Sequence, residues 1–509
     1  MLFYEIAILM KFASALRITK AFIVINITLL VSSCGLLGPD YQQPVIDTPN
    51  NFRSAASSGM SVESGVNLSD VSWWTKFNDP TLNQLIDDAL IHNNSIQSAV
   101  GNIAVAQAQL KRVHMGWIPT LGVGGLAGVG QTFNFSNGVP PSSGTSSLLP
   151  DDSSANFNFY GAGLVPNYSL NIFKLIKQAD AAEANLMVQK YTKDAVRLAV
   201  ISQVVGSYFT LLALDEQIKE QNQLINDLVE TNELQKIQYK HGYAALTDIQ
   251  QAQEQLEQAK MQLPTLENNK IIVENALQVL IDKNPGRIIN NNKLANIKTD
   301  SIIPISLPSS VLRNRPDIMQ AEGQLKLANA NIGVATASFF PNIDITTPLG
   351  LFNANYANLF DASGDFWEAQ ISATMPILNA GLFTLLKEKK ADYYVAYYNY
   401  VQTVRSAFAD VDDKFASYNA ANKTAISANS LYSITKLNQN LNQKNYKLGY
   451  AAYSDTMSSK VTLDNASLSV TQVKLQQLQS LVNLYQALAG GYNYKNTEQL
   501  NKFGDDRDS

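Results

Sequence analysis

The sequence is poor in the residues from which most catalytic and metal sites are built. Only one of its 509 residues is cysteine, three are histidine, and 16% are charged, against roughly 25% in an ordinary globular protein. A disulfide framework, a thiol redox pair and a Cys/His zinc site therefore lack partners or ligands. The net charge of −5 is spread without long basic runs, which excludes a nucleic-acid partner because such binding needs a basic patch.

Recognisable catalytic motifs are missing as well. His92, His114 and His241 lie far apart in the sequence, and none has a catalytic pattern beside it. The sequence contains no glycine-rich phosphate loop, no Gly-x-Ser-x-Gly and no His-Glu-x-x-His. The acidic pairs 87–88 and 412–413 are more typical of solvated helix faces than of acid/base dyads. We therefore expect a protein that is not an enzyme and that needs no cofactor.

The N-terminus carries the pattern of an export signal. A basic region ends at Lys20, and an apolar run of 11 residues, 21–31, follows it. This run is too short to span a bilayer, which takes about 20 residues, but it suits a signal peptide. Small residues then precede Cys34, as in a bacterial lipoprotein signal, where the cysteine receives diacylglycerol and a fatty acid and becomes the mature N-terminus. The alternative is an ordinary signal peptide with a chance cysteine. Met10 is an alternative start to Met1.

The signal is followed by a segment without regular structure. We assign residues 1–33 to the lipoprotein-type signal peptide and 34–78 to the lipid anchor and an extended tether, because proline, serine, asparagine and glycine are frequent there. Gly35 is not aspartate, so the usual inner-membrane retention signal is absent. No later stretch looks apolar enough for a transmembrane helix. If the protein spans a membrane, we expect it to do so with β-strands.

The rest of the chain is an internal duplication. Residues 239–248 return as 446–455 with seven of ten positions identical, and two further pairs of matching segments occur in the same order. We expect a first repeat over 79–300, a second over 301–495 and a polar tail over 496–509. The sequence pattern of each repeat predicts a helix, a strand pair and a long helical hairpin. The fold class is therefore mainly α with a small β part.

The first repeat shows these elements in order. Leucine, isoleucine and alanine recur at helical spacing over 81–115, and alternating strands follow over 121–136 and 156–165. Residues 173–238 contain no proline and predict one helix on the order of 100 Å long. The second repeat predicts two strands near 343–347 and 366–375 and a helix over 383–445. Both strand pairs read as β-hairpins.

The predicted strands are long enough to cross a bilayer, and aromatic residues lie near their ends. Four strands do not close a membrane barrel, for which 8 is the usual minimum, and an open sheet in lipid leaves backbone groups unpaired. If the sheet spans a membrane, the barrel must therefore be formed by an oligomer. A trimer would contribute 12 strands to it. The alternative is a small soluble β-subdomain.

The returning helices carry an apolar seam. Residues spaced alternately three and four apart face one side, and glutamine, asparagine, lysine and glutamate occupy the other. This seam comprises Ile249, Ala252, Leu256, Ala259, Leu263 and Leu266 in the first repeat, and Leu463, Ala466, Val470 and Val473 in the second. Such a pattern suits antiparallel helical hairpins, and equally a soluble coiled-coil rod. Pro264 is expected to kink or break its helix.

Several local motifs resemble one known family. The motifs are Gly-Pro-Asp-Tyr-Gln-Gln-Pro at 38–44, the Trp-x-x-Phe-x-Asp-Pro-x-Leu-x-x-Leu stretch at 74–85, Arg-Asn-Arg-Pro-Asp-Ile at 313–318 and the segment 482–491. Together with the duplication they resemble the outer-membrane efflux proteins, the TolC-like family, in its lipoprotein branch of NodT and OprM type. The resemblance covers about residues 34–495.

The resemblance implies a homotrimer in the outer membrane of a Gram-negative bacterium. It implies a 12-stranded transmembrane β-barrel above a long α-helical barrel that extends into the periplasm. The expected partners are a periplasmic adaptor (membrane fusion) protein, a proton-driven inner-membrane pump and outer-membrane lipid. Small-molecule efflux is the expected task. The alternatives are a protein-secretion tunnel and a structural periplasmic lipoprotein without a pore.

The resemblance also implies a periplasmic gate near the last helical turn. Tyr446 and Asp455 fall on the family's gate positions, and Ser458 stands where the family has a second acidic residue. Three Asp455 carboxylates near a three-fold axis would repel one another and raise their pKa values. The alternative is that Asp455 is an ordinary helix N-terminal aspartate, since its repeat mate Asp248 occupies the same place.

The turns themselves are the expected contacts for the adaptor. The residues concerned are Gly242, Tyr243 and Asp248 in the first turn and Gly449 and Tyr450 in the second. The alternative for the two glycines is that they only satisfy a positive φ in each turn.

Overall fold

The computed structural model describes residues 38–47, 52–54, 68–131, 156–290, 292–297, 314–353, 356–358, 360 and 365–494. The chain divides into two compact units. The sheet-bearing unit comprises Met1–Gln42, Ala108–Ala184 and Lys326–Tyr394, and the helical unit comprises Gln43–Gln107, Asn185–Leu325 and Val395–Ser509.

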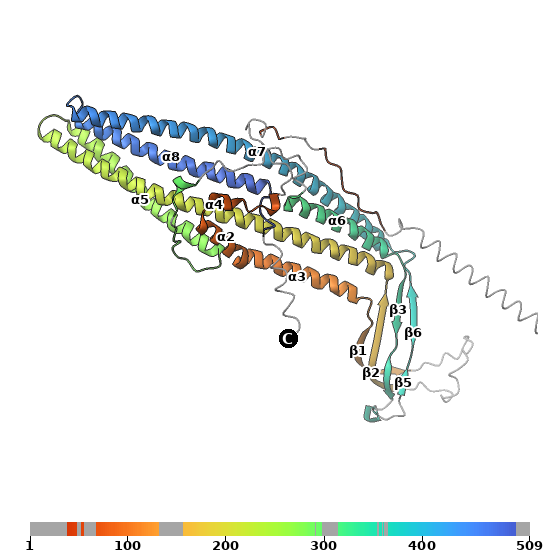
Figure 1. Cartoon of the computed structure of the whole chain (residues 1–509). Helices are drawn as coiled ribbons and strands as arrows, with labels where there is room; N and C mark the ends of the chain where they lie inside the picture. The colour runs from red at the N-terminus through yellow and green to blue at the C-terminus, as the bar shows by residue number, and fades with distance from the viewer. Residues whose placement is uncertain are drawn as a thin grey trace, which may run out of the picture. The chain divides into compact units, whose positions relative to one another are not determined.

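Helices make up most of the described chain (Figure 1). They are α2 (Pro80–His92), α3 (Asn94–Met115), α4 (Ile172–Lys240), α5 (Leu246–Leu280), α6 (Pro316–Ala337), α7 (Ala380–Lys447) and α8 (Tyr453–Ala487). Short 3₁₀-helices occupy Leu68–Asp70 (η3), Trp73–Phe77 (η4), Leu294–Asn296 (η5) and Tyr356–Asn358 (η7). The predicted helix over 81–115 is divided into α2 and α3 at Asn93. The Asn93 side chain explains the division, because its Oδ1 accepts the N–H of Ser95 at 3.0 Å and caps α3.

The long helices match their predicted extents closely. The helix predicted over 173–238 is α4, and the one predicted over 383–445 is α7. The expectation that no later stretch is apolar enough to span a membrane is wrong for α4, where an 18-residue stretch has a mean hydropathy of 1.5. That stretch is 61% buried within the described structure, so packing in a protein core accounts for its apolar character. Helix α5 is not broken at Pro264 but continues to Leu280.

In the first repeat, the predicted seam is the packed face of the helical hairpin. Ala252, Leu256 and Ala259 of α5 are buried, and the last two form a cluster with Leu224 and Leu228 of α4. In the second repeat, Ala466 of the predicted seam is buried, but the α8 residues that pack against this cluster are half-buried Val461 and Leu468, which lie outside that seam. The α5 seam therefore packs on α4, as antiparallel hairpins require.

The last part of the predicted tether is instead part of the core of the helical unit. Trp73 and Trp74 of η4 are each 1% exposed. The Trp73 ring stacks on Tyr485 of α8 at 4.5 Å between centroids, and its Nε1 donates to the carbonyl of Gly490 at 3.2 Å. Two tryptophans and Phe77 carry too much apolar surface to remain in a solvated tether, so residues 68–78 fold onto the helices.

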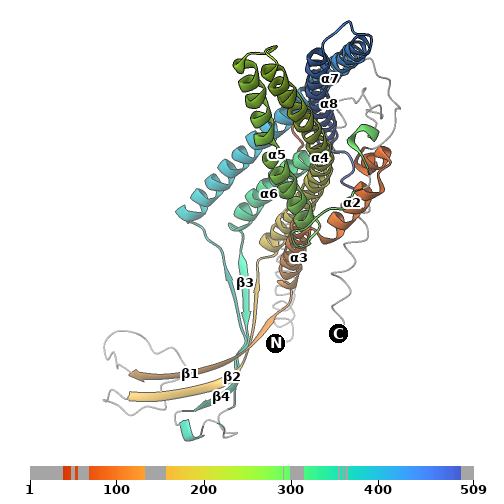
Figure 2. The ribbon, with the colours of Figure 1, turned by 90° about the vertical axis from the view of Figure 1, so that its left-hand side faces the viewer.

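In the part of the chain that the structure describes, the sheet consists of six strands, and all of its pairings are antiparallel. The strands are β1 (Thr120–Gln131), β2 (Asn156–Leu170), β3 (Asn342–Thr346), β4 (Leu349–Asn353), β5 (Asp365–Trp367) and β6 (Gln370–Thr374). β1 pairs along the length of β2, whose other side pairs first with β4 and then with β3. β4 pairs with β5 and β3 with β6, so β3–β4 and β5–β6 act as two long strands beside β1 and β2, each interrupted once. Figure 2 shows β4 beside β2.

The interruptions were not predicted from the sequence. Pro348 lacks the N–H that a continuous ladder needs, which separates β3 from β4. The break between β5 and β6 lies opposite Pro348, where the N–H of Glu368 donates to the carbonyl of Pro348 at 3.1 Å. Predicted strand residues 132–136 lie outside the described residues. Leu121, Val123 and Val129 of β1 are 67–86% exposed, so one face of β1 is apolar and is not covered by the residues that the structure describes.

Candidate functional site: the two helical turns

The α4–α5 and α7–α8 hairpins end in turns of matching geometry. Gly242 has a φ of 77° and Gly449 a φ of 79°. In both turns the next residue, Tyr243 or Tyr450, donates its N–H to a carbonyl five residues earlier at 2.8 Å. This left-handed ending is favourable for glycine, so the repeated Tyr-x-x-Gly-Tyr pattern encodes the turn itself.

Two aspartates complete the turns in the same way. The Asp248 carboxylate accepts the N–H of Ala245 at 2.8 Å, and the Asp455 carboxylate accepts the N–H of Ala452 at 3.2 Å. Each aspartate lies in the first turn of its helix, α5 or α8, where a negative charge also interacts favourably with the helix dipole. Capping is therefore a role that both aspartates perform within a single chain.

The turns present exposed side chains at one end of the helical unit. Figures 1 and 2 both place the two turns together at that end. Tyr243 is 85% exposed and Tyr450 is 83% exposed. The predicted gate residues Tyr446, Asp455 and Ser458 are also exposed, and the Tyr446 ring lies 5.0 Å from that of Tyr453. The structure thus brings the predicted turn and gate residues to one surface.

Farther along the helices from the turns, a charged network joins α4 and α8. The sequence did not predict this network. Asp227 of α4 is 2% exposed, and Lys460 of α8 reaches it with an Nζ–Oδ1 distance of 2.6 Å. Asp464, one turn along α8, also faces Asp227. Burial and the interaction with Asp227 raise the pKa of Asp464 to about 7, although Lys460 opposes this rise. An acidic pair in α4 and α8 thus shares one lysine.

Two further links extend this network along the same pair of helices. On the side of the turns, the Tyr453 hydroxyl donates to Glu230, and this hydrogen bond raises the pKa of Tyr453 to about 12. On the other side, Glu220 accepts hydrogen bonds from Ser467 at 2.6 Å and from Thr471 at 3.1 Å. The only sequence signal for these contacts is the polar face opposite the seam, which does not specify partners.

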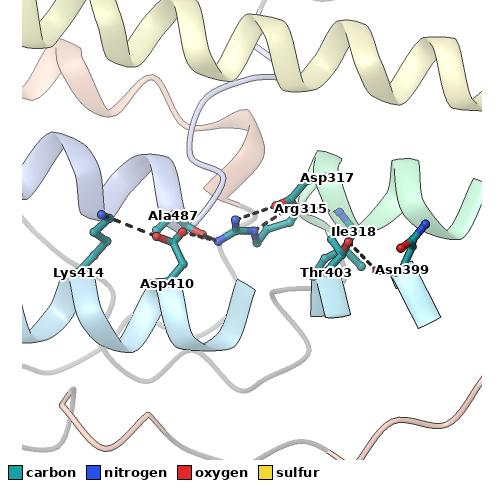
Figure 3. Close-up of polar contacts among 8 residues, drawn as sticks. All are labelled: Arg315, Asp317, Ile318, Asn399, Thr403, Asp410, Lys414 and Ala487. Atoms are coloured by element: carbon teal, nitrogen blue, oxygen red, sulfur yellow. Dashed lines mark hydrogen bonds and ion pairs between the residues drawn. The ribbon is translucent and has the colours of Figure 1, made fainter. Parts of the chain in front are cut away.

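A second polar junction lies at the start of the second repeat, within the motif at 313–318 (Figure 3). The Arg315 guanidinium donates to both carboxylate oxygens of Asp317, at 3.0 and 2.8 Å. It also donates to Asp410 of α7 at 3.1 Å and to the carbonyl of Ala487, the last residue of α8, at 2.7 Å. Burial lowers the pKa of Arg315, but the two carboxylates outweigh it and raise the pKa. This motif therefore fastens three helix segments together.

The remaining candidates from the sequence carry no such network. His92, His114 and His241 are exposed. Among the residues that the structure describes, no group of three His, Cys, Asp or Glu side chains is placed to hold a metal ion. Cys34, the predicted site of acylation, lies outside the described residues.

Comparison with known proteins identifies the family. The family model for outer membrane efflux proteins matches residues 85–282 and 307–490, and so spans both repeats. The chain belongs to the outer membrane efflux protein family. The solvent efflux pump outer membrane protein SrpC of Pseudomonas putida is 30% identical to it over 481 residues, which cover 91% of this chain and 97% of SrpC. The prediction made from the local motifs is thereby confirmed.

Other relatives agree in sequence and fold. The probable outer membrane lipoprotein SilC of Salmonella typhimurium is 27% identical over 475 residues, covering 92% of this chain and 98% of SilC. The solved outer-membrane channel OprN has a TM-score of 0.75 at 22% identity, covering 90% of this chain and 99% of OprN. Because the chain belongs to this family, it is an efflux protein of the Gram-negative outer membrane, as predicted. Its fold is mainly helical with a small sheet.

Proposed function

We propose that three copies of this chain form one conduit through the outer membrane and the periplasm. The observation that supports a trimer is the sheet. Its outer edges, those of β1 and of β5–β6, have no strand partner among the strands described here. Lipid contains no water that could hydrogen-bond to an unpaired backbone group, and each such group costs several kcal/mol. Exposed strand edges in a membrane therefore need partner strands. Three sheets of four long strands joined edge to edge make a closed barrel of 12 strands.

The chain then serves as the passive part of a three-component pump. A periplasmic adaptor contacts the exposed turns at Gly242, Tyr243 and Asp248 and at Gly449 and Tyr450, and a proton-driven inner-membrane pump supplies the energy. The absence of catalytic motifs from the sequence fits a channel that conducts without chemistry. Cys34 carries the acyl chains that hold the N-terminus in the membrane, which fits the name of SilC as a probable outer membrane lipoprotein.

The conduit closes at the turn end of the helical unit. Near a three-fold axis, Tyr446, Asp455 and Ser458 of three copies form the gate. The repeat provides a matched control, because Asp248 caps α5 with the same kind of hydrogen bond that Asp455 makes at α8. Losing this hydrogen bond costs about 1 kcal/mol at either site, whereas only Asp455 belongs to the proposed gate.

The gate is tested by conductance. In planar bilayers, Asp455→Ala is expected to raise single-channel conductance, and Asp248→Ala is expected to leave it unchanged. Equal effects of the two substitutions would show that capping alone explains Asp455 and would refute the gate.

The substrate class is tested in a deletion strain. SrpC is named for solvent efflux, and we expect small molecules here too. Loss of the gene should increase susceptibility in a panel of solvents, dyes, antibiotics and metal salts, and the intact gene should restore resistance. Unchanged susceptibility together with loss of a secreted protein would instead favour the protein-secretion tunnel. Absence of any conductance would favour a structural lipoprotein without a pore.

A further inference from the structure

A short segment after the proposed anchor, residues 38–41, lies against α6; we call it the strap. Its first residue, Gly38, crosses α6 at Gly333. A β-carbon added to Gly38 would lie only 2.9 Å from the Cα and 3.2 Å from the backbone nitrogen of Gly333. Gly38 also has a φ of 108°, which residues with a side chain rarely adopt. The crossing therefore requires glycine and fixes where on α6 the strap begins.

Two further contacts continue the strap toward the N-terminal end of α6. The Asn329 side chain donates to the carbonyl of Pro39 at 2.8 Å, and Lys326 Nζ lies 5.2 Å from the centre of the Tyr41 ring. Lys326 stands seven residues before the crossing glycine, about 10 Å along the helix. Tyr41 stands three residues after the first strap residue, about 10 Å of extended chain. The two lengths agree, so the strap runs extended and antiparallel to α6.

The N-terminal end of the strap lies toward the end of α6 that leads to the sheet. Beyond the crossing, α6 ends at Ala337 after about 6 Å of helix, and β3 begins at Asn342. In the opposite sense, the four residues from Gly38 back to Cys34 span at most about 14 Å. That length exceeds the roughly 6 Å of helix between the crossing and the end of α6.

We propose that the strap positions the acyl anchor relative to the strands. Docked along α6, it holds the lipid-bearing N-terminus at the level where the strands enter the membrane, which a free tether would not do. Because β3 follows α6 in the chain, docking of the strap on α6 fixes the position of the anchor relative to the sheet. The anchor then raises the effective concentration of the strands at the membrane surface. This inference rests on the proposed acylation of Cys34.

The test uses the full chain in isolated outer membranes. Gly38→Ala places a methyl group against the α6 backbone, and Gly101→Ala is the control because nothing lies within 4 Å of its added β-carbon. Chymotrypsin cleavage after Tyr41 reports undocking of the strap. Mass spectrometry of the N-terminal peptide reports acylation. The share of the chain found in the outer membrane reports insertion.

For Gly38→Ala we expect unchanged acylation, roughly tenfold faster cleavage, equivalent to about 1.4 kcal/mol of lost docking, and a smaller share of inserted chain. Asn329→Ala removes a single hydrogen bond and should give a smaller change in the same direction. Unchanged cleavage would refute docking, and faster cleavage with full insertion would refute positioning. An unacylated wild-type chain would instead overturn the proposed anchor, and this inference with it.

Discussion

The sharpest pH dependence of this channel is expected where α4 meets α8. Asp464 lies beside buried Asp227, with Lys460 and Glu220 as the other charged neighbours that affect its pKa. Burial and Asp227 raise its pKa from 3.8 to about 7. The substitution Asp464→Asn keeps the size of the side chain and removes its ionisation. It therefore isolates the contribution of this one proton to the α4–α8 contact.

The sign and size of the effect follow from the pKa. Between pH 3.8 and about 7 the folded chain holds a proton on Asp464 that the unfolded chain has released. The stabilisation is therefore complete below pH 3.8 and is lost as the pH rises through about 7. A rise of about three pKa units corresponds to an upper bound of about 4 kcal/mol. Because Asp464 is only half-buried, solvent screening reduces this to about 1–2 kcal/mol.

The assay is denaturant unfolding of the purified protein at pH 5.5 and pH 7.5. The wild-type chain should be more stable at pH 5.5. Because about half of the pH range from 3.8 to about 7 lies below pH 5.5, Asp464→Asn should remove about 0.5–1 kcal/mol of that difference. Asp392→Asn is the control, because Asp392 forms an exposed ion pair with Lys389 at 3.0 Å on the surface of α7. If the Asp464→Asn chain keeps the full pH dependence of the wild type, this carboxyl group does not have the role described.

Two other substitutions test the packing of each unit. Trp73→Ala removes a side chain that is 1% exposed and stacked on Tyr485; it should lower the free energy of unfolding by about 3–5 kcal/mol, and Trp73→Phe should lower it less in the same denaturation assay. Gly163→Ala brings a β-carbon against the carbonyl of Leu349 and should disrupt β2–β4 pairing. Gly122→Ala, whose nearest neighbour lies at 3.7 Å, should not. Heat-modifiable migration in a gel measures the difference between these two variants, and equal migration would show that the close strand crossing is not needed.

Features set by local sequence were predictable. Residues 173–238 contain no proline and one glycine, so a single long helix is the favoured conformation, and α4 follows it within a few residues. The duplication predicted that both turns would share one geometry, and Gly242 and Gly449 do so within 2° of φ. Most strand positions were also predictable, because alternation has a period that only a strand satisfies. The sequence did not predict β4, the break between β5 and β6, or the continuation of β2 past Pro166 to Leu170.

Contacts between distant residues were decided only by the tertiary structure. Asp227 and Lys460, Arg315 and Asp410, and Trp73 and Tyr485 are paired across long separations in the sequence. Periodicity shows which face of a helix is apolar, but not which helix it meets or how far the two slide along each other. From the sequence alone, a charged residue is therefore predicted to be solvated, because the sequence does not show which packed partner buries it. That is why the sequence by itself determined the helices, turns and strands, whereas packing decided the α4–α8 network, the Arg315 junction and the docked strap.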